Sequence, residues 1–176
     1  MARSMMDRYW RSMESVAKRD RKKGTRFGLS RSLAMSKAAI LESMRLEGAA
    51  KPEIKAAAAL MKHATYGEKI GSANLADLFN EAVTIHEQHG EQTLKNAAYA
   101  ISKHAWELKR QAITRDVATH SVGNSIAHLG SVIGDGVRDF LNPELTKFIK
   151  GDIEHYKPSD EVKKRLFAFL DKRNKT

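Results

Sequence analysis

Two histidines near the middle of the chain are the first residues whose type and spacing suggest chemistry. The segment Thr84-Ile85-His86-Glu87-Gln88-His89 is close to a zinc-protease helix. Such a site needs H-E-x-x-H, because ligands four residues apart share one helical face with the Glu between them. Here the second His comes one residue early and no third ligand is evident. We therefore expect no metal site and no cofactor, and interpret both histidines as polar residues near a helix C-terminus, where positive charge is favourable.

A second pattern, Arg115-Asp116-Val117-Ala118-Thr119-His120, sets an arginine and a histidine within one predicted helix. It resembles the R-x4-6-H motif of the HEPN ribonuclease family. The resemblance implies a dimer whose paired motifs form one metal-independent RNA-cleaving site, with His120 as acid or base and Arg115 binding the scissile phosphate. A group that titrates near neutrality and a guanidinium suit that chemistry. The alternative interpretation is that Asp116 and His120 form a surface pair one helical turn apart.

The basic charge of the chain is concentrated at its N-terminus. Lys and Arg number 31 against 21 Asp and Glu, which gives a net charge of +10 at pH 7. Residues 1–31 hold ten of the cations and three carboxylates, whereas residues 72–92 hold four carboxylates and no Lys or Arg. A positive excess of this size favours polyanionic partners. The acidic stretch is either a solvated helix face or a surface that meets the basic face of another copy.

Residues 1–28 predict a basic amphipathic arm that binds nucleic acid. Its cations release counterions from phosphates, and its aromatic rings can stack on bases or anchor the arm to the core. Arginine outnumbers lysine, which suits two-pronged contacts to phosphate. The expected aromatic anchors are Tyr9, Trp10 and Phe27. The expected phosphate contacts are Arg3, Arg8, Arg11, Arg19, Arg21, Lys22, Lys23 and Arg26.

No motif for reading bases accompanies this charge. Zinc-finger spacing, an RRM-like aromatic signature and a clear helix-turn-helix are all missing, so we expect binding to the backbone without sequence preference. The sequence also lacks a P-loop, a G-x-G-x-x-G after a strand and a G-x-S-x-G elbow, and it has no Cys. We expect a non-enzymatic structural protein that coats, packages or organises DNA or RNA as a homo-oligomer, such as a component of a virion or mobile element.

A second alternative is a membrane-surface or virion-ejection protein, because the Met and Trp stripe beside arginines also suits anionic lipid. No apolar run approaches the roughly 18 to 20 residues that span a bilayer. Arg3, Asp7 and Arg8 interrupt any signal-peptide core. We therefore expect a location inside the cell, in the cytoplasm or within a virion, with no secretion signal and no transmembrane segment.

Composition and periodicity predict an all-α fold. Only 3 Pro and 7% aromatic residues occur, apolar residues recur at intervals of three and four, and nothing alternates with period two. We expect six or seven helices, no sheet, and two parts: the basic N-terminal helical arm over 1–28 and a single helical bundle over 29–176. Predicted helices run from Ser30 or Ser32 to about Leu46, from Pro52 to about Thr65, from Ser72 or Asn74 to Gly90, from about Gln92 to Thr119 and from Ser159 to Lys172.

The long helix predicted over 92–119 and the glycine-rich segment after it complete the bundle. We expect the inner face of the long helix to hold Leu94, Ala97, Ala98, Ile101, Ala105, Trp106, Leu108, Ala112 and Ile113. Residues 121–136 keep helical apolar spacing although each glycine costs a helix up to about 1 kcal/mol relative to Ala. We expect Gly123, Gly130 and Gly134 to permit close approach of another helix. A hinge between two halves of the bundle is the competing interpretation.

Overall fold

The computed structural model describes residues 4–23, 29–65 and 74–174. No strand occurs in these ranges, so the all-α prediction is confirmed. None of the helices in them is long and apolar enough to cross a membrane. The predicted site residues Arg3, Arg26 and Phe27 lie outside the described residues, as do the side chains of Lys22, Lys23 and His120.

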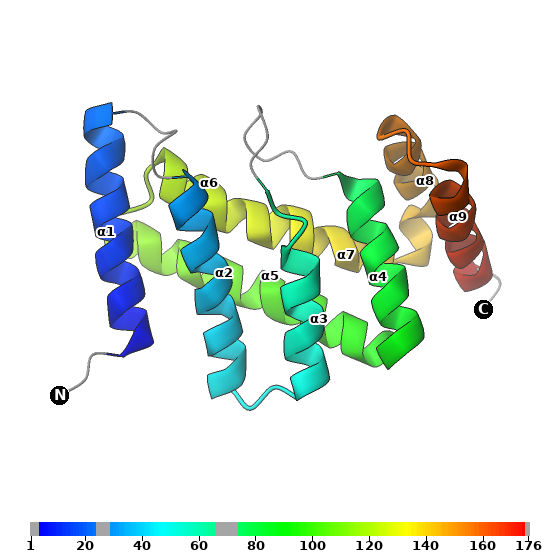
Figure 1. Ribbon diagram of the computed structural model, residues 1–176, viewed down its shortest axis with the longest axis horizontal. Helices are drawn as coiled ribbons and strands as arrows, with labels where there is room; N and C mark the ends of the chain where they lie inside the picture. Colours follow the sequence, from blue (N-terminus) through cyan, green and yellow to red (C-terminus); the bar gives the residue numbers. More distant parts are fainter. Residues whose placement is uncertain (1–3, 24–28, 66–73, 175–176) are drawn as a thin grey trace.

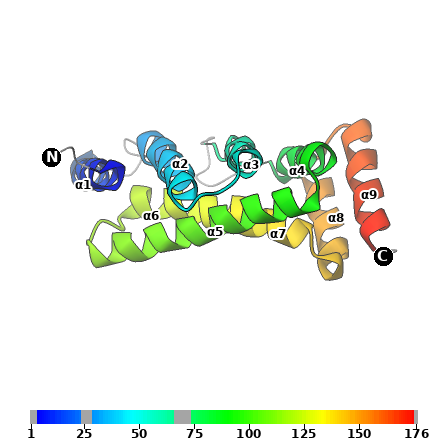
Figure 2. The ribbon, with the colours of Figure 1, turned by 90° about the horizontal axis from the view of Figure 1, so that it is seen from below.

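The helices form two crossed layers. Four helices lie side by side in the first layer (Figure 1): α1 (Met5–Lys23), α2 (Leu29–Leu46), α3 (Lys51–Met61) and α4 (Leu75–His89). The second layer runs across them (Figure 2) and holds α5 (Glu91–Thr114) and a continuous helix made of α6 (His120–Ala127), the π-helical segment η2 (His128–Asp135) and α7 (Gly136–Phe140). At the α4 end the chain closes with the short 3-10 turn η3 (Pro143–Leu145), α8 (Thr146–His155) and α9 (Asp160–Asn174).

Local sequence signals explain where several helices begin and end. The Asn74 side chain accepts hydrogen bonds from the backbone nitrogens of Ala76 and Asp77 at 3.0 and 3.3 Å, and so caps α4. Gly48 after α2 and Gly90 between α4 and α5 have φ of +80° and +90°. Only glycine adopts such angles at no steric cost, which is why the turns fall there.

The expected number of helices and the expected arm are not confirmed. With α6, η2 and α7 counted as one helix and η3 joined to α8, the described residues form eight helices. Helix α1 packs against α2 and α6, and its buried side belongs to the same apolar core as the rest of the described chain. The buried residues of α1 are Tyr9, Trp10, Met13, Val16 and Ala17.

The long helix is shorter than predicted because a C-terminal turn closes it. The backbone nitrogen of Val117 donates to Ala112 O at 2.9 Å and that of Asp116 to Ile113 O at 3.1 Å. This pair of bonds is the Schellman arrangement, in which the residue that follows the helix cap has a left-handed backbone conformation. Asp116 is that residue, with φ of 55°. The helix therefore ends at Thr114 rather than at 119.

Two residues assigned to the inner face of the long helix lie on its outer face instead. Trp106 is 43% exposed and Ile113 is 61% exposed. The buried stripe contains Leu94, Ala98, Ile101 and six further residues. Trp106 and Ile113 follow Tyr99 at seven-residue intervals, on the face of α5 opposite to its buried residues. Their assignment to the inner face was wrong because it rested on their apolar character alone.

The two helices of the second layer pack most closely at glycines. A Cβ on Gly134 would lie 2.7 Å from the backbone nitrogen of Ser102 in α5, and one on Gly130 would lie 3.2 Å from both Ala105 and Trp106. A Cβ on Gly123 would lie 3.2 Å from the Lys109 ammonium nitrogen. Helix α5 and segment η2 therefore touch along their backbones near Gly134.

Candidate nucleic-acid interface

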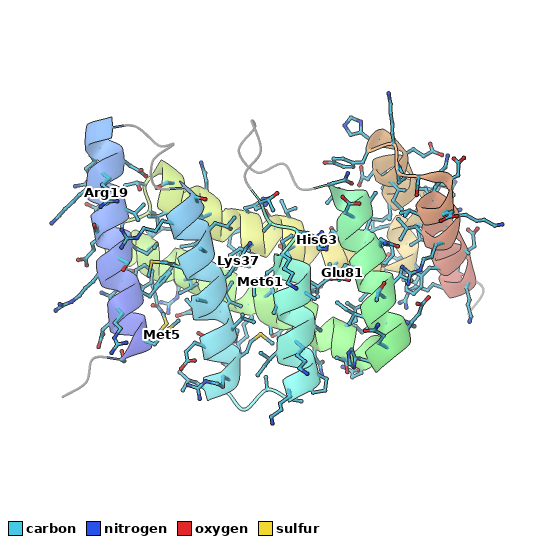
Figure 3. All side chains as sticks on the ribbon, in the orientation of Figure 1. Met5, Arg19, Lys37, Met61, His63 and Glu81 are labelled. Carbon is cyan, nitrogen blue, oxygen red and sulfur yellow. The ribbon has the colours of Figure 1, made fainter. Side chains whose placement is uncertain are left out.

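The outer face of α1 carries a row of exposed cations. Arg8, Arg11, Lys18 and Arg19 are all exposed, and Arg21 is exposed on the flank of the row. At 100° per residue, the first four fall within about a third of the helix circumference, opposite the buried stripe. Figure 3 labels Arg19 on α1, the outermost of the four helices that lie side by side. Lys18 was not among the predicted contacts, although its spacing from Arg8 and Arg11 indicates the same face.

Among the described residues these cations have no acidic partner within ion-pair distance, unlike Lys150, Lys163, Arg165 and Arg173 at the other end of the molecule. From Arg8 to Arg19 the row spans eleven residue steps, which is about 16 Å of helix axis. The row therefore offers cations without a close ion pair along one helix, although the exposed Asp7 and Glu14 lie one turn from Arg11 and Lys18.

The two aromatic residues of α1 fix the helix rather than face solvent. Tyr9 is 1% exposed and its hydroxyl lies 3.1 Å from the Ser36 hydroxyl of α2. Trp10 donates its indole N–H to Gln111 of α5 at 3.1 Å, and the Arg115 guanidinium lies 5.1 Å from its ring centroid. Of the two roles expected for these rings, anchoring to the core is the one that their burial allows.

Burial also changes the acidity of the Tyr9 hydroxyl. Its pKa is raised to about 12, because burial disfavours the charged phenolate, while the hydrogen bond with Ser36 opposes this effect. The Tyr9 hydroxyl therefore stays neutral over the whole physiological range.

The C-terminal half of α1 is tied to the start of α6. The Asp20 carboxylate accepts hydrogen bonds from the hydroxyl of Ser121 and, at 3.5 Å, from that of Thr119. Beside it lies an open hollow of about 420 Å³ that is lined in part by Arg21 and Lys109. The Lys109 ammonium donates to Gly123 O at 3.4 Å, so this hollow has cations on both of its sides.

The Arg115 and His120 pair spans a turn and does not share a helix. Arg115 caps the end of α5, and His120 is the first residue of α6. Arg115 stacks over Trp10. The ribonuclease interpretation thus loses the continuous helix that the sequence suggested for the motif, because of the turn at Asp116.

His86 lies against another helix, and His89 is exposed. The His86 ring meets Phe169 of α9 edge-on, with centroids 5.0 Å apart, and His89 is exposed at the end of α4. In the part of the chain that the structure describes, no three His, Asp or Glu side chains gather as a metal site would require. The histidines instead serve packing and surface roles.

A buried histidine that the sequence did not single out lies in η2. His128 is 6% exposed, and in the described ranges neither ring nitrogen has a hydrogen-bond partner. Its pKa is lowered by burial and then by the positive charge of Lys37 in α2. Lys37 donates to Ala64 O at 2.8 Å, and burial lowers its own pKa. Lys37 faces the region near His63 and Glu81, whose side chains lie 3.9 Å apart (Figure 3).

The acidic stretch is partly neutralised within the chain. Glu87 pairs with Arg165 of α9 at 2.7 Å, and Glu91 pairs with Arg173 at 2.6 Å. Arg165 also donates to Asn80 and Thr84 of α4. These carboxylates therefore hold α9 against α4 and α5, which is a structural use the sequence did not indicate.

Comparisons with protein families, with curated proteins and with solved structures give no significant match to this chain.

Proposed function

We propose that this protein is a non-enzymatic nucleic-acid-binding structural protein, and that it contacts the phosphate backbone through the outer face of α1. The observation that carries the proposal is the exposed row of Arg8, Arg11, Lys18 and Arg19, which has no acidic partner among the described residues. Phosphates are the natural counterions for such a row, since their neutralisation releases condensed cations. We include in the proposal that these cations contact phosphates rather than base edges, so that binding is independent of sequence.

The anchoring of α1 supports this role. A helix held by Tyr9 and Trp10 presents its cations in fixed relative positions. The row from Arg8 to Arg19 is about 16 Å long, which matches about five base-pair steps of 3.4 Å. We include in the proposal that several copies coat, package or organise DNA or RNA together, as a homo-oligomer in a virion or a mobile element.

Removal of the N-terminal segment does not test this proposal, because it would also remove five buried core residues. The sharper test is the quadruple variant Arg8→Gln, Arg11→Gln, Lys18→Gln and Arg19→Gln, which leaves the buried face unchanged. Its matched control neutralises four exposed lysines of the α8 and α9 end, with Lys147→Gln, Lys157→Gln, Lys164→Gln and Lys172→Gln.

Both variants are titrated against duplex DNA and single-stranded RNA by fluorescence anisotropy at several salt concentrations. We expect the α1 variant to lose at least about tenfold in affinity and to flatten the logarithmic salt dependence by about 0.9 per lost contact to duplex. The control, which changes net charge equally, should keep the wild-type slope. Equal slopes for the α1 variant and the wild type would refute the α1 assignment.

A further inference from the structure

The outer face of α5 carries an alternating series of cations and apolar rings or chains. Between Lys95 and Ile113 its exposed residues are, in order, Lys95, Tyr99, Lys103, Trp106, Arg110 and Ile113. The carboxylate of this helix over that range, Glu107, is 45% exposed and pairs with Arg110. Three of these six residues are among the five large hydrophobic side chains exposed in the described ranges. In Figure 2 the side of α5 that faces away from α1–α4 is not crossed by another helix.

We propose that this face, the α5 stripe, binds single-stranded nucleic acid by stacking bases on Tyr99 and Trp106 while Lys95, Lys103 and Arg110 contact phosphates. This inference rests on the proposed function and adds a second surface with a different preference, since duplex bases are not free to stack. Ring faces accept any base, so the contact remains independent of sequence.

Trp106 is held as a rigid stacking surface. Its indole lies against Gly130, where a Cβ would come within 3.2 Å of Cε2, and its N–H lies 3.4 Å from an Asp135 carboxylate oxygen. The other oxygen of Asp135 accepts a 2.5 Å hydrogen bond from Ser102, which fixes the carboxylate. The ring therefore keeps a set orientation while 43% of the residue stays open to solvent.

Tyr99 lies beside a hollow of about 350 Å³ with cationic walls. Lys95, Arg138 and the side chains of Asn96 and Asn142 contribute to its lining. The Arg138 guanidinium lies 5.6 Å from the Tyr99 ring centroid. A base stacked at Tyr99 would thus have two cations close to its phosphate. Seven residues separate Tyr99 from Trp106, which is about 10 Å along the helix.

The flanking carboxylates do not block this use of the cations. Lys95 pairs with Glu91 and Lys103 with Glu47, both at 3.2 Å, and Arg110 pairs with Glu107 at 2.5 Å. The Arg110 side chain nevertheless remains 72% exposed. Exposed ion pairs of this kind contribute little to stability, so a phosphate can replace the partner or join it.

The main rival occupant is a second copy of this chain, since Tyr99, Trp106 and Ile113 recur at heptad spacing. A helix-helix seam requires a second apolar residue in each heptad. Here those positions hold Ser102, which is buried, and Lys109. Two α5 stripes packed together would also bring Lys103 and Arg110 of one copy close to the same cations of the other copy. The α5 stripe therefore suits a single-stranded nucleic acid, with its phosphates and bases, better than it suits the α5 stripe of a second copy.

The test compares Tyr99→Ala and Trp106→Ala with Trp106→Phe, using poly-dT as the single-stranded probe and a duplex of equal length. We expect each alanine variant to bind poly-dT at least about fivefold more weakly, which is the lower limit for loss of one stacked base. Duplex affinity should not change, and Trp106→Phe should keep most of the poly-dT affinity. Saturating poly-dT should also quench the emission of exposed Trp106 in the wild type. Unfolding midpoints of all variants exclude a folding defect.

Unchanged poly-dT affinity in both alanine variants would overturn the α5 stripe. So would a shift from dimer to monomer in sedimentation without a change in affinity, which would assign the stripe to self-association. Failure of the proposed function would give a different result from failure of the α5 stripe. In that case the α1 quadruple variant would bind duplex DNA as tightly as the wild type does. An intact α1 effect with no Tyr99 or Trp106 effect leaves the proposed function standing and removes the inference alone.

Discussion

Gly134 lies so close to Ser102 that a Cβ at Gly134 would be within 2.9 Å of the Ser102 Cα and Cβ. The neighbouring Asp135 accepts a hydrogen bond from the same serine. The contact therefore fixes both the separation of α5 from η2 and their register.

Gly134→Ala should destabilise the fold, because the atoms it meets belong to the backbone and cannot turn away. We expect a loss of about 1 to 3 kcal/mol in the free energy of unfolding, as for other overpacked sites. The matched control is Gly151→Ala in α8, where a Cβ meets nothing within 4 Å. That change should leave stability equal or raise it by up to about 1 kcal/mol. Urea denaturation measures both, and equal midpoints for the two variants would contradict the packing argument.

Tyr9→Phe should lower stability at neutral pH and reduce its sensitivity to alkali. Loss of the bond to Ser36 costs about 1 kcal/mol. The pKa of Tyr9 is about 12 in the folded chain against an ordinary value of 10.0. The unfolded chain therefore loses the proton first, so the contribution of Tyr9 is present below about pH 10 and is lost as the pH rises toward 12.

Denaturation of wild type and Tyr9→Phe between neutral and strongly alkaline pH checks this. The stability difference between the two proteins should shrink or reverse above about pH 10. Tyr99→Phe, which removes a hydroxyl from an exposed residue, should follow the wild type at every pH. A constant difference between wild type and Tyr9→Phe across the range would mean that the Tyr9 hydroxyl is not buried as described.

His128 should make the fold sensitive to mild acid. Its pKa is lowered by burial and by Lys37, so the unfolded chain binds a proton at a higher pH than the folded chain does. The stability that depends on a neutral His128 is present above the ordinary value of 6.5 and is lost as the pH falls below it. His128→Leu should flatten the decline in melting temperature below about pH 6.5.

His89→Gln is the control for this experiment, because His89 is exposed at the end of α4. It should retain the wild-type acid sensitivity. If His128→Leu lost stability on acidification as steeply as the wild type, the acid transition would have to come from other groups.

How far the sequence predicts the structure depends on whether a feature is local. The end of α4 at Gly90 and the apolar stripe of α1 were readable from the sequence, and Asn74 was one of two expected starts of α4, because each rests on residues within a few turns of helix. The end of α5 at Thr114 was missed, because Asp116 in a left-handed conformation looks like any helical aspartate in the sequence.

The candidate sites show the same division. The cations of the α1 row were predicted as phosphate contacts, apart from Lys18. The burial of Tyr9 and Trp10 could not be predicted in the same way, because their partners, Ser36 in α2 and Gln111 in α5, lie 27 and 101 residues further along the chain. Trp106 was assigned to the core because tryptophan is apolar. The period of seven from Tyr99 to Ile113, with cations between, was the signal that could have placed it outside.

The anchoring of α1 has a calorimetric consequence. A basic tail that folds on its target buries fresh apolar surface, and its association then shows a large negative heat-capacity change. In this chain the apolar side of α1 is already covered by α2 and α6 before any polyanion arrives. Capture of a phosphate strand by the row from Arg8 to Arg19 should therefore leave the heat capacity almost unaltered, with the entropy of released ions as its main driving term.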